Sequence, residues 1–487
     1  MTGVVLAAKL LGFVKQVVVA GVFGADIETD LFFLAERFSV NIEFIFYQMI
    51  LAAFIPVYLD AKKRSDSDAL RFTSDSIGFF SVLVASLALA VVLSSPLLAS
   101  IIAPSYSAEL TGRLSFYLRI FAPLIVFSVL QSIFHALLNA NKRFIPGQLT
   151  GVVQSTVIIC FSLLLGNTLG VKTLVVGFFA YSTLNFLFLG IFSHNDWRFK
   201  FSGFRLSRDM KRLLSMMLPL LLGYMFNFVN QQINKIIVSG MDPGSFSAMN
   251  YGSVLSNFVS ALIMAVCTVL YTEISGKIAE GETGRASSAA VRTMSVLVVL
   301  LIPVSVISVF FSREIVAIVF ERGAFDRTAA LSTAQALGGY GFMFVPFVVK
   351  SMLSQLHYAH GETKIPVING AVGILFNILF SFLLYRRFGL FGVTLAFSIG
   401  IFISAVLNII SACRMKYVDN FQSVTHLVPV LSLGFAVSCG TSYVCARLLS
   451  EVGVYVRFGV TACVVTAVSL GVTAPFVFKK NVDREAK

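Results

Sequence analysis

Fourteen runs of mostly apolar residues, separated by short charged or turn-forming segments, make up most of this 487-residue chain. A membrane-spanning helix needs about 20 such residues, and in hydrocarbon each backbone polar group must be satisfied inside the protein. Only 13% of the residues are charged, against about 25% in soluble globular proteins. The pattern predicts an all-α polytopic membrane protein with about fourteen spans. They are residues 3–23, 30–58, 74–98, 114–138, 147–167, 173–193, 213–239, 247–273, 289–311, 331–358, 366–385, 391–412, 424–449 and 457–478.

Lysine and arginine are distributed unevenly between the segments that join these spans. If both termini are cytoplasmic, 22 of the 37 basic residues lie in cytoplasmic segments and 7 in outer loops. Cytoplasmic loops of membrane proteins collect Lys and Arg, so the bias predicts that both termini are cytoplasmic. It also accounts for the net charge of +13, and we therefore expect no nucleic-acid partner.

Two short sequence patterns recur in the two halves of the chain. Leu10-Leu-Gly-Phe13 resembles Leu221-Leu-Gly-Tyr224, and the segments 139–146 and 359–366 both contain a basic residue before a final Ile-Pro. Spans 1–6 and 7–12 are therefore predicted to form two six-helix lobes, related by a pseudo-twofold axis along the membrane normal. The predicted domains are an N-lobe at 1–200, a C-lobe at 201–420, and two extra helices with a basic cytoplasmic tail at 421–487.

The second span carries an unusual number of polar residues for a membrane helix. Four of them, spaced 7, 4 and 7 residues apart, fall within about 20° of one line along the helix, and a second pair lies roughly 120° away. Ionisable residues in a span usually face a partner or a cavity. A buried ion pair that only orients helices is one explanation, and we favour the lining of a hydrated cavity. The first line consists of Asp30, Arg37, Asn41 and Gln48, and the second of Glu36 and Glu43.

Further polar residues mark spans 1, 7, 8 and 10. Amides in spans 7 and 8 suit either hydrogen bonds between helices or contacts to a substrate, and the sequence leaves both roles open. Lysines at membrane depth are expected to be functional, because a charge there is costly. The amides are Asn227, Gln231, Asn234 and Asn257, and the lysines are Lys15, Lys235 and Lys350.

No pattern in the chain predicts an enzyme. Walker A, Gly-x-Ser-x-Gly and His-Glu-x-x-His motifs are absent from the sequence, so we expect no ATP site, cofactor or metal. The six cysteines form no Cys-x-x-Cys pair and are interpreted as small buried residues. The outer loops are expected to be short, and the longest, at 312–330, is too small for the extracytoplasmic domain of a membrane glycosyltransferase.

Six stretches of the chain form a characteristic set: Leu11-Gly-Phe-Val-Lys15, Phe23-Gly-Ala25, Thr29-Asp-Leu-Phe-Phe33, Ala53-Phe-Ile-Pro56, Phe320-Glu-Arg-Gly-Ala-Phe325 and Gly361-Glu-Thr-Lys-Ile-Pro366. Together they resemble the MurJ/MviN family of lipid-linked oligosaccharide flippases. The resemblance implies the fold of the multidrug/oligosaccharidyl-lipid/polysaccharide exporter superfamily, with two lobes around a central cavity and two added helices that form a lipid-tail groove. It also implies export of polyprenyl-diphosphate-linked saccharides, with lipid II, the peptidoglycan precursor, as the usual substrate.

Some of the family's charged positions are kept in this sequence and others are replaced. The family's basic residue in span 1 matches Lys15, and its acidic residue at the start of span 2 matches Asp30. Elsewhere the family's charges are replaced, which weakens the assignment to lipid II and raises the alternative of another lipid-linked repeat unit. The replacements are Gly21, Glu43, Phe44, Ser253, Val254 and Asn257.

We therefore expect a flippase that carries a polyprenyl-diphosphate-linked saccharide, with lipid II as the leading substrate, from the inner to the outer leaflet by alternating access. The resemblance implies a bacterial inner membrane, and we expect a monomer in contact with membrane lipids. The alternatives are a flippase for O-antigen, teichoic or capsular repeat units, and a cation-coupled drug antiporter of the same superfamily. For coupling to an ion, the expected residues are Asp30, Glu36 and Glu43.

The charge bias generates a topology prediction. Alkaline phosphatase fused after Lys487 should be inactive and a green fluorescent protein at the same point should fluoresce, because the C-terminus is expected in the cytoplasm. Alkaline phosphatase inserted after Lys172, in a predicted outer loop, should be active. An active phosphatase at the C-terminus would contradict the predicted orientation.

Overall fold

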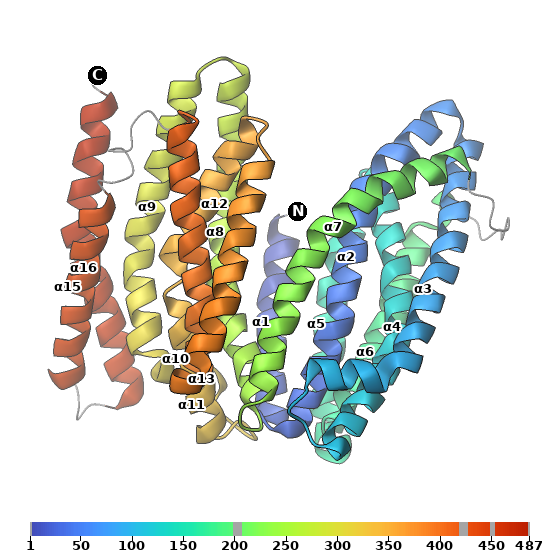
Figure 1. The fold of residues 1–487 in the computed structure, drawn as a ribbon, viewed down its shortest axis with the longest axis horizontal. Helices are drawn as coiled ribbons and strands as arrows, with labels where there is room; N and C mark the ends of the chain where they lie inside the picture. The colour runs from blue at the N-terminus through green and yellow to red at the C-terminus, as the bar shows by residue number, and fades with distance from the viewer. Residues whose placement is uncertain (1, 198–206, 418–426, 449–452, 486–487) are drawn as a thin grey trace. The chain divides into compact units, whose positions relative to one another are not determined.

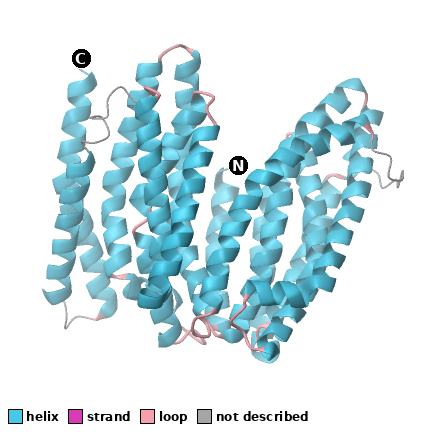
Figure 2. Cartoon of the chain, viewed as in Figure 1, coloured by secondary structure: helices cyan, strands magenta, loops and turns pink. Residues whose placement is uncertain are grey.

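The structure, a computed structural model, describes residues 2–197, 207–417, 427–448 and 453–485. Within these ranges the chain consists of helices joined by short loops, and no strand is present (Figures 1 and 2). The prediction of an all-α fold is confirmed. The helices are α1 (Thr2–Phe23), α2 (Ile27–Arg64), α3 (Asp66–Ile102), α4 (Ala108–Ala140), α5 (Phe144–Leu169), α6 (Lys172–Phe192), η1 (His194–Asp196), α7 (Arg208–Ser239), α8 (Ser245–Ala279), α9 (Thr283–Phe310), α10 (Ser312–Phe320), α11 (Arg327–Gly341), α12 (Phe344–Ala359), α13 (Lys364–Arg414), α15 (Leu427–Leu448) and α16 (Val454–Glu485).

The predicted spans coincide with these helices wherever the structure describes them. Spans 11 and 12 fall in one continuous element, α13, whose backbone leaves helical geometry at Gly389. Nine helices of the described residues are long and apolar enough to cross a membrane, and a bent pair brings this to ten. The exact number of fourteen spans stays a prediction.

Two local features differ from the sequence-based expectation. The segment 312–330, expected to be a loop, contains the short helix α10, which buries Val316 and Phe320 at a helical spacing of four residues. The tenth predicted span, 331–358, is divided into α11 and α12, whose axes differ by 45°. In both segments the apolar residues predict a buried stretch of chain. They do not indicate where a helix begins or bends.

Side-chain caps explain where several helices begin. The carboxylate of Asp26 accepts the backbone N–H of Thr29 at 2.9 Å at the start of α2. The hydroxyl of Ser65 accepts the N–H of Asp68 at 3.0 Å, so α3 starts directly after α2 ends. Such caps satisfy backbone donors that have no partner inside the helix and stabilise it by about 1 kcal/mol each.

By contacts the chain divides into two compact units. The first comprises residues 1–247 with 322–326, and the second comprises 248–321 with 327–487. Helix α7 belongs to the first unit because it packs against α2 and α3. The lobe boundaries at residues 200 and 420 were inferred from sequence repetition and stay a prediction.

In the first unit, a triangle of phenylalanine rings joins three helices. Phe32 of α2, Phe121 of α4 and Phe178 of α6 meet edge to face, with ring centroids 5.5, 5.6 and 5.8 Å apart. All three side chains are buried. Aromatic pairs of this kind add about 0.5–1.5 kcal/mol each to the energy of burial, so the triangle fixes the relative positions of α2, α4 and α6.

In the second unit, α8, α9, α12 and α13 share one hydrophobic core that includes Ile274, Met294 and Met352. The two halves of α13 approach each other closely. A Cβ atom at Gly373 would lie 2.4 Å from the carbonyl oxygen of Gly400, so only glycine fits there.

This close approach generates a prediction for stability. Gly373→Ala should lower the apparent melting temperature in detergent, because overpacking typically costs about 1–3 kcal/mol. Gly370→Ala is the matched control, since a Cβ at Gly370 has open space around it and alanine favours the helix by up to about 1 kcal/mol. Equal melting temperatures for the two variants would contradict the packing described for α13.

Candidate functional site

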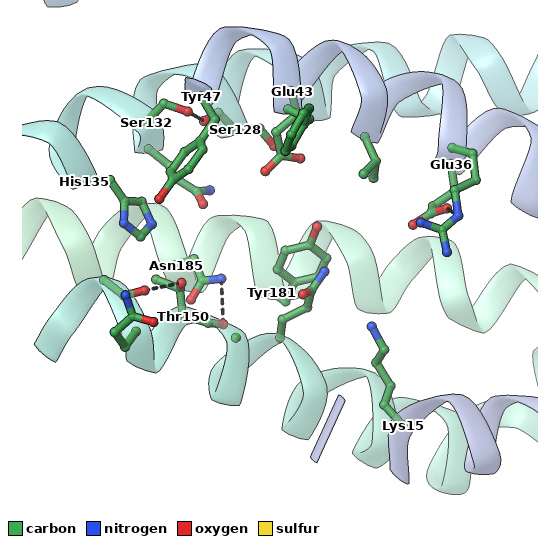
Figure 3. Close-up of a pocket in the computed structure, with 18 of the residues that line it drawn as sticks. Lys15, Glu36, Glu43, Tyr47, Ser128, Ser132, His135, Thr150, Tyr181 and Asn185 are labelled. Carbon is green, nitrogen blue, oxygen red and sulfur yellow. Dashed lines mark hydrogen bonds and ion pairs between the residues drawn. The ribbon is translucent and has the colours of Figure 1, made fainter. Parts of the chain in front are cut away.

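A cavity of about 450 Å³ lies inside the first unit. Its size is within the range of about 300–1,000 Å³ that small-molecule sites occupy. Its walls come from α1, α2, α4, α5 and α6 (Figure 3). The lining residues are Lys15, Gln16, Glu36, Arg37, Val40, Glu43, Phe44, Tyr47, Ser128, Gln131, Ser132, His135, Gly147, Gln148, Thr150, Gly151, Gln154, Tyr181 and Asn185. We refer to this cavity as the polar pocket.

Helix α2 presents one of its two predicted polar lines to the polar pocket. Glu36, Arg37 and Glu43 all line it, and Nε of Arg37 is 3.5 Å from Oε2 of Glu36. Asn41 and Gln48, from the other predicted line, are half-buried and are not part of the lining. Of the predicted line, which also includes Asp30, only Arg37 belongs to the lining of this pocket, and the functional role of the line stays a prediction.

The walls formed by α4, α5 and α6 were not anticipated from the sequence. On α4 the lining residues follow one helical face with spacings of three and four, and on α6 Tyr181 and Asn185 are four residues apart. Nε2 of Gln131 donates to the carbonyl of Ser182 at 2.9 Å, and Nδ2 of Asn185 donates to the carbonyl of Thr150 at 3.3 Å. The sequence signal that could have predicted the α4 wall is the helical spacing of its polar side chains. The α4 face consists of Ser128, Gln131, Ser132 and His135.

Lys15 enters the polar pocket from α1 and points toward its centre (Figure 3). Among the residues that the structure describes, Lys15 forms no ion pair or hydrogen bond. Two other polar atoms of lining residues, Oε1 of Gln16 and Oδ1 of Asn185, are buried without a hydrogen-bond partner among the described residues. A buried polar group without a partner is costly, so the polar pocket is suited to a ligand that carries hydrogen-bonding and charged groups.

Asp30, at the start of α2, has a different environment. Its two carboxylate oxygens accept the backbone N–H groups of Gly244 and Ser247, at 2.8 and 2.7 Å. Next to it, the hydroxyls of Thr29 and Ser247 are 2.9 Å apart. The carboxylate thus caps the first turn of α8, where the helix dipole favours a negative charge.

A small cavity adjoins this contact and includes the phenol of Tyr106, from the loop between α3 and α4. Burial, together with the nearby Asp30 carboxylate, raises the pKa of Tyr106. The phenol therefore stays protonated at neutral pH and remains a hydrogen-bond donor.

The Phe320-Glu-Arg-Gly-Ala-Phe325 stretch makes a second contact, with the end of α1 that directly precedes the start of α2. The N–H of Ala324 donates to the carbonyl of Gly21 at 2.8 Å. Gly323 has a φ of +60°, and a Cβ there would lie 2.2 Å from the oxygen of Gly21. We call the contacts of Gly21, Asp30, Gly244, Ser247 and residues 322–326 the loop clasp.

The other predicted site residues lie elsewhere in the two units. Lys235 of α7 is buried, and its Nζ has no hydrogen-bond partner among the described residues, as is also true of Oδ1 of Asn234. Lys350 is half-buried on α12, and Asn257 is exposed on α8. Asn227 and Gln231 belong to α7, but their side chains lie outside the described part of the structure. The role of each of these residues stays a prediction.

Comparison with known proteins gives a consistent result. A family model described as lipid II flippase MurJ matches residues 19–462. A probable lipid II flippase MurJ from Buchnera aphidicola subsp. Schizaphis graminum is 27% identical over 375 residues, which are 74% of this chain and 72% of the relative.

Solved structures show the same fold. A lipid II flippase MurJ in an inward closed conformation has a TM-score of 0.83 at 21% identity, with 99% of each chain covered. An inward-facing multidrug resistance MATE family transporter of the MOP superfamily has a TM-score of 0.71 at 14% identity, with 84% of this chain and 94% of that chain covered. The predicted exporter fold is confirmed.

The capping role of Asp30 generates a stability prediction. Asp30→Asn should lower the apparent melting temperature, because an amide accepts at only one atom and hydrogen bonds to a charged group contribute about 1.5–3 kcal/mol. Glu109→Gln, which removes an exposed carboxylate from the first turn of α4, is the control. A melting temperature of Asp30→Asn equal to that of the unaltered protein would mean that the carboxylate does not stabilise this contact.

Proposed function

Because this chain belongs to the lipid II flippase family, whose model matches most of its length, we propose that it moves lipid II from the inner to the outer leaflet of the bacterial inner membrane by alternating access. The chain is a multi-pass membrane transporter and not an enzyme. The family match over residues 19–462 is the observation that carries this proposal. The polar pocket supports it, since a transporter of charged headgroups needs polar surface within the membrane.

The physical task is to move a charged headgroup through hydrocarbon. Each polar group that loses its hydrogen bonds there costs several kcal/mol, whereas the polyprenyl tail can stay in the lipid. The lysines Lys15, Lys235 and Lys350 are proposed to bind the anionic groups of the substrate through charge-assisted hydrogen bonds. Two of them support this role by lacking a fixed partner: Lys15 forms no ion pair among the described residues, and the buried Nζ of Lys235 is unpaired.

The loop clasp is proposed to close the outer side of the protein in one state of the transport cycle. With both termini in the cytoplasm, the end of α1 and the start of α2 lie at the outer face, and so does the start of α8. A few hydrogen bonds, including those of Asp30 with Gly244 and Ser247, form a contact that can open and re-form. Asp30 would then position helices and not contact the substrate.

The energy source is proposed to be the membrane potential. An inside-negative potential drives an anion outward by about 2.3 kcal/mol per charge per 100 mV, which fits a substrate that carries a diphosphate. Counter-transport of a cation, with Glu36 or Glu43 as its ligand, is the second possibility. We propose that the protein works as a monomer without an ATP site of its own.

The saccharide is tested by depleting the protein from its own cells and measuring the lipid-linked precursors that accumulate. Accumulated lipid II is the expected result. Normal lipid II with an accumulated O-antigen, teichoic or capsular precursor would assign the protein to that polymer instead. This alternative is included because Gly21 and Phe44 replace charged residues of the family.

Neutralising the lysines proposed to bind the anionic groups of the substrate should strongly reduce transport. In the depleted cells, Lys15→Gln and Lys350→Gln are each expected to lower lipid II export at least tenfold, which corresponds to the loss of about 1.4 kcal/mol of binding. Lys172→Gln, which alters an exposed lysine at the start of α6, should export normally. Normal export by both Lys15→Gln and Lys350→Gln, at equal protein levels, would remove the proposed role of these lysines.

A further inference from the structure

The polar pocket contains a lysine and a glutamate that form no ion pair within the described part of the chain. Four charged side chains line it, and two of them, Glu36 and Arg37, pair with each other at 3.5 Å. Lys15 and Glu43 remain, and neither takes part in an ion pair within the part of the chain that the structure describes. Ser128 lies within reach of the Glu43 carboxylate but carries no charge.

These two charges enter the polar pocket from different helices. Figure 3 shows Lys15 pointing in from α1 and Glu43 pointing in from α2, with Tyr181 of α6 also directed into this space. Leaving both charges in a protein interior without partners is costly. A ligand with a single charge would compensate one of them and repel the other. A ligand with an ammonium and a carboxylate group would compensate both.

The remaining lining suits a peptide. Side-chain amides come from α1, α5 and α6, and two of their oxygens, Oε1 of Gln16 and Oδ1 of Asn185, are buried without a donor. Backbone N–H groups of a ligand are suitable donors for them. The rings of Tyr47 and Tyr181 supply flat apolar surface, and a cavity of about 450 Å³ has room for a short peptide segment.

We propose that the polar pocket binds the peptide of the lipid-linked precursor, with a side-chain ammonium group of that peptide on Glu43 and a carboxylate on Lys15. This inference rests on the proposed function and adds which part of the substrate the first unit recognises. Peptidoglycan precursors carry a peptide with free carboxylates and, in many bacteria, a diamino acid with a free amine. A neutral saccharide unit has neither group, so the pocket would also select the peptidoglycan precursor against such units.

The test compares two forms of lipid II on the purified full-length protein in lipid nanodiscs. One form keeps the free amine of its diamino acid, and in the other this amine is acetylated. The unaltered protein should bind the acetylated form about tenfold more weakly, because a hydrogen bond between charged groups is lost. Glu43→Gln should bind both forms with affinities within twofold of each other. Lys15→Gln should weaken binding of both forms and keep the difference between them, and the surface control Glu109→Gln should behave as the unaltered protein.

Several outcomes would overturn the inference. Equal binding of both forms by the unaltered protein, a comparison that needs no variant, would show that the amine is not recognised. A difference that persists in Glu43→Gln would place the amine at another residue. A soluble peptide of the same sequence that binds as tightly as lipid II would assign the polar pocket to free peptides. Failure to bind either form of lipid II would count against the proposed function itself.

Discussion

Hydrocarbon offers no hydrogen bonds, and this single constraint governs both the fold and the site of this protein. The described chain is helical because helices satisfy their own backbone groups. The side chains that carry charge at the same depth have to face inward, and in the first unit they do so together. Lys15, Glu36 and Glu43 line one cavity. Helices α5 and α6, which also line this cavity, carry exposed apolar residues such as Leu164 and Leu187 elsewhere on their surfaces.

Helix α2 is the element that joins the two functional features of the first unit. Its first turn holds Asp30, which accepts N–H groups at the start of α8, and its middle holds the two carboxylates of the polar pocket. About two helical turns separate Asp30 from Glu36. Helix α2 therefore takes part in both the loop clasp and the polar pocket.

The sequence predicted this fold to a large extent, and it predicted part of the site. Long apolar runs and the charge bias were sufficient for the helices, and the spacing of Glu36 and Glu43 was sufficient to put both on one face. The partners of Asp30 could not be predicted from the sequence. Gly244 and Ser247 are more than 200 residues away, and they bind through backbone N–H groups, which every residue except proline has.

The walls of α4 to α6 escaped prediction for a different reason. Serine, glutamine and tyrosine are common inside membrane bundles as bridges between helices, so a residue such as Gln131 is not distinctive until its neighbours are known. The short helix α10 was missed because apolar residues in a segment of only nine residues do not distinguish a buried loop from a helix.

The aromatic triangle of Phe32, Phe121 and Phe178 has a mechanical consequence. Edge-to-face rings transmit compression but tolerate little sliding, since interiors are packed as densely as organic crystals. Three helices that are packed together at a common point are expected to change direction together. The first unit is then expected to tilt as one rigid body during transport, carrying any peptide it holds without reshaping the space around it.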